Sequence, residues 1–285
     1  MVCFIIGLAL FAVSGWLWYT KLYSTPQRVF WGMINNGLST RGVTRVIDES
    51  AEGGSSKQII RLSFNGDTRS YSLADITQQG AGAINAITTQ TIGTNTADYI
   101  SYTKISPDDG RFVDVLNVWG KTNEDGEDVS QRSNFLLESL FGLVPIANLN
   151  PAERQNVVSQ LQNNKVYDVD YSKVTYKTVR GRAAIVYPVK LNLAAYVSML
   201  NGYLKILGVQ NPNEIDASGY EGQSASLSLA VDKLSHQLLT LNYDNSNRTE
   251  AYGNYGVVSL EGLPLNTVSV NELQTRLQKT LQQTQ

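Results

Sequence analysis

The sequence predicts an α+β fold in which antiparallel hairpins flank one helix that lies on a face of the sheet. One observation is the alternation of apolar and polar residues with period two in four stretches: 166–177, 183–191, 224–232 and 237–243. Such alternation is typical of strands with one buried face. The other observation is a helical period between these stretches, where residues 193–207 place apolar side chains at every third or fourth position. Strands on both sides of a single helix indicate an α+β architecture with antiparallel pairing.

The N-terminal residues predict a membrane anchor. Residues 2–19 carry no charged side chain, which is just enough apolar chain to span a bilayer, and Trp16, Trp18 and Tyr19 would lie at one interface. We expect residues 1–23 to form a retained transmembrane helix. A cleaved signal peptide is the alternative, with 12–14 as the small-residue cleavage site. A lipid-modified Cys3 does not fit, because it precedes the apolar run instead of following it.

The remaining residues, 24–285, predict a single domain, because no repeat or low-complexity linker divides them. The charges beside the apolar run give conflicting indications of the side of the membrane on which this domain lies. Lys21 and Arg28 follow the apolar run and no basic residue precedes it, which taken alone would keep the domain in the cytoplasm. Long domains, however, cross membranes largely regardless of such charges. We therefore expect an α+β domain outside the cytoplasm.

Before residue 165 the pattern predicts a helix, a meander of strands and two more helices. Thr25 and Pro26 form a helix start, and Asn150 with Glu153 forms a capping box. Asn65 and Gly66 predict a type I′ hairpin turn. The expected strands are 43–47, 58–64, 69–73, 84–92, 98–105 and 112–119, and the two helices lie at 134–143 and after residue 150. After residue 244 we expect one strand, 249–260, and a final helix, 270–284.

Composition excludes several classes of function. The net charge is −2, so nothing predicts a nucleic-acid partner. One cysteine and one histidine, His236, leave no pattern for a metal or another cofactor, and we expect His236 at the surface. Residues 101–104 read S-x-x-K but fall in an expected strand without a K-T-G partner, and the acidic loop 123–128 lacks EF-hand spacing. We therefore expect no enzymatic activity.

Two helices carry the residues that we select as candidates for lining a ligand site. Their apolar and aromatic side chains have two interpretations: ordinary core, or the wall of an apolar cavity between helices and sheet. Methionine and aromatic side chains adapt in shape, which suits a lipid site. The candidates are Phe135, Leu136, Leu140, Phe141, Tyr196, Met199, Leu200, Tyr203 and Leu207.

The stretch 179–189, the helix after it and the hairpin 229–239 together resemble the half-barrel lipoprotein-carrier fold of the LolA/LppX type. This resemblance implies a strongly curved antiparallel sheet with helices packed on its concave face. It also implies a membrane-tethered protein that holds a lipid or other apolar ligand in the cavity between them. The alternative is a structural or protein-interaction module of the bacterial cell envelope, with a filled core and Tyr220, Tyr252 and Tyr255 on its outer surface.

Overall fold

A computed structural model describes residues 23–78, 84–107, 110–122, 135–209, 214–256 and 258–282. Among these residues, no helix combines the length and apolar character that a bilayer crossing needs. The expected anchor lies outside the described residues except for Tyr23, and so does the acidic loop 123–128.

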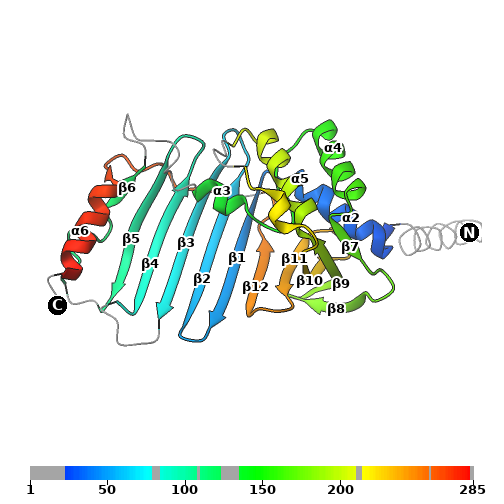
Figure 1. Ribbon diagram of the computed structural model, residues 1–285, viewed down its shortest axis with the longest axis horizontal. Helices are drawn as coiled ribbons and strands as arrows, with labels where there is room; N and C mark the ends of the chain where they lie inside the picture. Colours follow the sequence, from blue (N-terminus) through cyan, green and yellow to red (C-terminus); the bar gives the residue numbers. More distant parts are fainter. Residues whose placement is uncertain are drawn as a thin grey trace, which may run out of the picture.

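The predicted α+β class is confirmed: the chain builds one large, curved, unclosed sheet with a few helices (Figure 1). The strand order is β13-β6-β5-β4-β3-β2-β1-β12-β11-β10-β9-β7, and β8 also pairs with β9. Every pairing is antiparallel except that of β13 with β6. The strands are β1 Gly42–Ala51, β2 Gly54–Ser63, β3 Arg69–Gln78, β4 Ala86–Gly93, β5 Asp98–Ser106, β6 Trp119–Lys121, β7 Tyr167–Val169, β8 Thr175–Val179, β9 Arg182–Asn192, β10 Ser224–Asp232, β11 Leu238–Tyr243, β12 Arg248–Gly253 and β13 Val268–Ser269.

Helices cover two separate regions of this sheet (Figure 1). The first region contains α2 (Pro26–Gly37), α3 (Phe135–Leu140), α4 (Pro151–Asn163) and α5 (Leu193–Ile206), whose apolar faces join one core cluster with β1, β2, β9, β10 and β11. The second contains α6 (Val270–Gln282), which buries Leu273 against the region around β5 and β6. The short η3 (Ala217–Tyr220) follows α5.

The capping signals position the covering helices largely as predicted. Asn150 accepts hydrogen bonds from the N–H groups of Ala152 and Glu153, and Glu153 bonds back to the Asn150 N–H, so the capping box forms. Asn192 likewise accepts from the Ala195 N–H at the start of α5. Thr25 precedes α2 in extended geometry, but its side chain makes no capping hydrogen bond. Of the two residues that predicted this helix start, only Pro26 therefore plays the expected part, at the first helical position.

Four local predictions are wrong: in three of them a turn divides, replaces or ends an expected strand, and in the fourth the turn is of a different type. The stretch 166–177 is two strands, β7 and β8, separated by a turn in which Asp170 accepts from the Ser172 N–H. Residues 112–117 form tight turns ending at Asn117 (φ 60°), and the expected strand 249–260 stops at Gly253 because Asn254 has φ 53°. Asn65 lacks the positive φ of a type I′ turn, although Gly66 (φ 81°) does join β2 and β3.

Candidate functional site

The structure brings eight of the nine candidate residues into one apolar cluster between the helices and the sheet. Six are buried there: Leu136, Leu140, Tyr196, Met199, Leu200 and Tyr203. Phe141 and Leu207 are half-buried against the same cluster. The ninth, Phe135, is half-buried at the start of α3, where its N–H donates to Asp98 Oδ2 at 3.1 Å.

The opposite wall of this cluster comes from α2 and the sheet. Phe30 and Met33 of α2 are at most 1% exposed, and the Phe30 ring meets the Tyr187 and Tyr167 rings edge-on at 5.5 Å and 5.8 Å. Leu229 and Leu241 complete the wall from β10 and β11. The candidate residues are therefore packed as core, with side chains that can change shape at its centre.

Residues 141–149, which we call the strap, connect α3 to α4 and lie against this cluster. Three buried tyrosines donate their hydroxyls to strap carbonyls, each at 2.6 Å: Tyr196 to Gly142, Tyr167 to Leu143 and Tyr203 to Ile146. Main-chain bonds from Ala147 to Gly37 and from Leu149 to Leu38 join the strap to the end of α2. Two of the candidate residues, Tyr196 and Tyr203, thus also make hydrogen bonds, which the helical spacing of apolar residues did not predict.

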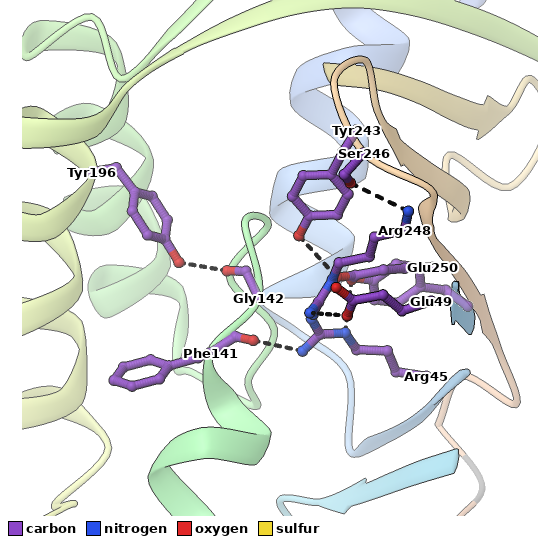
Figure 2. A network of polar contacts seen from close by, with 10 residues as sticks. Arg45, Glu49, Phe141, Gly142, Tyr196, Tyr243, Ser246, Arg248 and Glu250 are labelled. Carbon is purple, nitrogen blue, oxygen red and sulfur yellow. Dashed lines mark hydrogen bonds and ion pairs between the residues drawn. The ribbon is translucent and has the colours of Figure 1, made fainter. Parts of the chain in front are cut away.

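A buried ion pair holds the beginning of the strap (Figure 2). Arg45 and Glu250 are 3% and 1% exposed, and Arg45 donates to both carboxylate oxygens of Glu250 at 2.7 Å. The same guanidinium donates to the Phe141 carbonyl at 2.6 Å. Tyr243 and Tyr252 also donate to Glu250, at 2.9 Å and 2.6 Å, and the half-buried Arg248 donates to its Oε1 at 3.0 Å and 3.2 Å. The carboxylate is therefore fully paired.

Burial and pairing act in opposite directions on these groups. Burial would raise the pKa of Glu250, but the charge and hydrogen bonds of Arg45, with those of Tyr252 and Tyr243, hold that pKa at about 2. Burial likewise acts to lower the pKa of Arg45, and Tyr252 and Glu250 raise it above its usual value. Burial raises the pKa of Tyr196 and Tyr203, so both hydroxyls remain hydrogen-bond donors at neutral pH.

Two surface expectations are wrong. His236 is only 6% exposed, because its ring stacks on Tyr23 at 4.5 Å and packs against Gly32, where a Cβ would stand 2.5 Å from the imidazole Nδ1. Burial lowers the pKa of His236. Tyr252 is 2% exposed, so it belongs to the core and to the Glu250 network, not to an outer face.

The Arg45–Glu250 pair is the part of the site that sequence reasoning missed, and one signal pointed to it. Arg45 alternates in phase with Val43 and Ile47, both buried, so its position in the strand faces the core. Its partner is 205 residues away, and no local pattern predicts that pairing. Within the described residues, no group of three potential metal ligands occurs together.

Of three comparisons with known proteins, one finds a similar structure. No family profile matches the sequence, and none of the curated proteins matches it. Among solved structures, the chain is similar to the crystal structure of LprF from Mycobacterium bovis, with 12% identity and a TM-score of 0.45. The match covers 84% of this chain and 96% of that one.

Proposed function

We propose that this protein is a membrane-tethered binding protein outside the cytoplasm that holds a lipid or other apolar ligand between its sheet and the helices α3 and α5. The observation that carries the proposal is the apolar cluster under the strap, which joins the helix layer to the sheet through Leu136, Met199 and Tyr203. An acyl chain that enters this layer keeps apolar surface out of water, at about 25 cal/mol per Å2, and requires no catalytic group.

The distribution of polar contacts supports entry of the apolar ligand at the strap. The tyrosine hydroxyls and Arg45 hold its carbonyl groups, whereas Met199 and Leu200 meet the rest of the layer through apolar surface alone. Apolar contacts can re-form around a guest of different shape, but hydrogen bonds must be broken one by one. Release of the strap is therefore the step that would expose the cluster to a ligand.

Photo-crosslinking tests this function directly. The full chain, extracted in a non-ionic detergent, is mixed with a diazirine-labelled palmitic acid, irradiated, and the labelled peptides are identified. We expect labels in α3, in the strap and in α5, and native mass spectrometry should show one bound lipid that denaturation releases. Labels confined to other regions, or an unlabelled chain, would contradict the proposal.

Neighbouring positions on α5 offer a matched pair of variants. Met199→Trp enlarges a side chain that is 3% exposed in the cluster, whereas Ser198→Trp adds the same ring to an exposed position one residue earlier. We expect Met199→Trp to reduce labelling and Ser198→Trp to leave it unchanged. A thermal unfolding curve for each variant shows whether the chain still folds, so loss of labelling counts only where the cooperative transition remains.

The tether and the location are part of the proposal and have their own support, the uncharged stretch 2–19. Protease added to intact cells should digest residues 24–285 while cytoplasmic proteins remain whole. Protection of these residues until the cells are lysed would place the domain in the cytoplasm. Extraction of the chain by carbonate instead of detergent would exclude the retained anchor.

The alternative, an envelope protein-interaction module without a ligand, is favoured by one surface feature. Tyr176 and Leu234 are 61% and 67% exposed, and the ammonium group of Lys233, the residue before Leu234, lies 5.7 Å from the centre of the Tyr176 ring. Exposed apolar side chains mark contact surfaces where they gather in one patch, and the Lys233 contact brings the chain beside Leu234 close to Tyr176. Cross-linking of a protein partner to Tyr176, together with a chain that carries no lipid, would support this alternative.

A further inference from the structure

The sheet divides locally between β11 and β12. The register of these strands ends at the pair Thr240 and Ala251, whereas β12 stays paired with β1 as far as Gly253. Beyond that point β11 and β12 separate. The Tyr252 carbonyl accepts a hydrogen bond from Arg180 at 2.8 Å, and the Leu238 carbonyl accepts one from the Tyr255 hydroxyl at 2.8 Å. Side chains therefore occupy the place of ladder hydrogen bonds, and the division is a stable part of the fold.

A pocket of about 440 Å3 lies at this division. Leu239, which is 4% exposed, gives it an apolar part, and Arg180 and Arg182 bring two positive charges to it. Gln237 and Asn254 add polar groups. The volume is within the range of small-molecule sites, about 300–1,000 Å3. None of the nine candidate residues lines this pocket, although Tyr252 belongs both to its lining and to the apolar cluster under the strap.

The two arginines keep most of their donors available. Within the described part of the chain, Arg180 makes one polar contact, to the neutral Tyr252 carbonyl, so its charge has no carboxylate partner there. Arg182 is half exposed and approaches Gln237 Oε1 at 3.3 Å and Asp232 Oδ2 at 3.5 Å. Asp232 Oδ1 is already used by the N–H groups of Leu234 and Ser235. Asp232 therefore balances the charge of Arg182, and Arg180 gives the pocket its excess of positive charge, although the whole chain is negative.

Arg180 also stands in an unfavourable backbone conformation. It and Gly181 form the two-residue turn between β8 and β9, with φ values of 51° and 77°. Such turns favour asparagine at the first position, because other side chains tolerate positive φ poorly. Strain of this kind occurs preferentially at functional positions. The turn carries the Arg180 side chain toward β12.

We propose that this pocket binds a small organic phosphate, with Arg180 and Arg182 on the phosphate oxygens and Leu239 under the organic part. Guanidinium groups match phosphate oxygens in geometry as well as in charge. The phosphate could belong to a soluble metabolite or to a lipid headgroup, since both present the same oxyanion. This proposal does not depend on the ligand under the strap.

The test uses the isotope-labelled full chain in non-ionic detergent micelles and follows the amide signals of Gly253 and Asn254. One arm adds glycerol 3-phosphate and inorganic phosphate, and the other adds phosphatidylglycerol to the micelles, with potassium chloride as the control for ionic strength. We expect saturable shifts that potassium chloride does not reproduce. Saturation in the first arm alone identifies a soluble ligand, and saturation in the second alone identifies a headgroup.

The decisive variant is Arg180→Asn, because asparagine suits the turn better than arginine while it removes the charge. We expect binding at least about tenfold weaker for Arg180→Asn and for Arg182→Gln, since each loses a charge-assisted hydrogen bond. Arg154→Gln, on α4, is the matched control and should bind as the unmodified chain does. Unchanged binding by Arg180→Asn, or no saturable shift in either arm at tens of millimolar, would overturn the proposal.

Discussion

Replacement of Glu250 by glutamine should strongly destabilise the fold. The substitution keeps the shape of the side chain but leaves the Arg45 guanidinium, 3% exposed, without its counter-charge. It also turns one acceptor of Glu250 into a donor, although every side chain that contacts this carboxylate donates to it: Arg45, Tyr243, Arg248 and Tyr252. Removal of one partner from a buried pair costs about 3–5 kcal/mol, a large part of the 5–15 kcal/mol that stabilises a typical domain.

Chemical denaturation of the full chain in non-ionic detergent, followed by circular dichroism, measures this cost. Glu49→Gln is the matched control, because Glu49 also contacts the network, through Arg248 at 3.4 Å, but its side chain is 47% exposed. Exposed pairs contribute about 0–1 kcal/mol. We expect a large shift of the midpoint for Glu250→Gln and a small one for Glu49→Gln. Equal shifts, or a cost below about 1 kcal/mol for Glu250→Gln, would refute this account of the pair.

The same carboxylate predicts the direction of the acid dependence. The pKa of Glu250 in the fold is about 2, below its usual 4.5, because Arg45 and the two tyrosines outweigh the effect of burial. A lowered pKa stabilises the fold above pH 4.5, and this contribution is lost as the pH falls from 4.5 to about 2. We expect the unfolding free energy of the chain to fall across this window and that of Glu250→Gln to fall less. Parallel curves would show that other groups control the acid transition.

Two further substitutions test the packing of the strap and of α3, each by thermal or chemical unfolding. Tyr203→Phe leaves the Ile146 carbonyl without its donor, so it should cost about 1–3 kcal/mol, whereas Tyr220→Phe, at a 37% exposed side chain, should cost almost nothing. Gly93→Ala places a Cβ 2.3 Å from the Leu136 nitrogen and should cost about 1–3 kcal/mol, whereas Gly219→Ala meets nothing within 4 Å. If either control variant lost as much unfolding free energy as the variant it is paired with, the corresponding contact would not explain the loss of stability.

Sequence patterns were sufficient to predict the strands in which apolar and polar residues alternate without a break. Residues 224–232 and 98–105 lie in β10 and β5 because alternate side chains such as Leu227 and Leu229 face the core. The pattern failed where a turn falls within an apolar stretch. Val166 and Val174 look continuous in the sequence, but hydrogen bonds from Ser172 to Asp170 fold the chain back between them. Local side-chain bonds of this kind compete with strand pairing and leave no periodic signal.

The candidate site was predictable in its apolar part alone. Helical spacing placed Tyr196, Met199 and Tyr203 on one face of α5, and that face is buried. The spacing could not show that two of these hydroxyls bond to the strap, because the strap has no period and lies 54 to 57 residues away in the chain. Arg45 and Glu250 meet only because β1 and β12 are neighbours in the sheet, a pairing fixed by the whole topology.

The polar contacts of the strap also set a lower limit on the length of an apolar ligand. Opening residues 141–146 of the strap, while its main-chain bonds to α2 stay in place, breaks four side-chain bonds, from Arg45, Tyr167, Tyr196 and Tyr203, at a net cost of about 4–6 kcal/mol. Each methylene group that becomes buried returns about 0.8 kcal/mol, so roughly five to eight are needed before binding begins. We therefore expect octanoic acid to displace a fluorescent fatty acid poorly and palmitic acid to displace it well, with Tyr203→Phe reducing the difference. Equal displacement by short and long chains would mean that ligands enter without opening the strap.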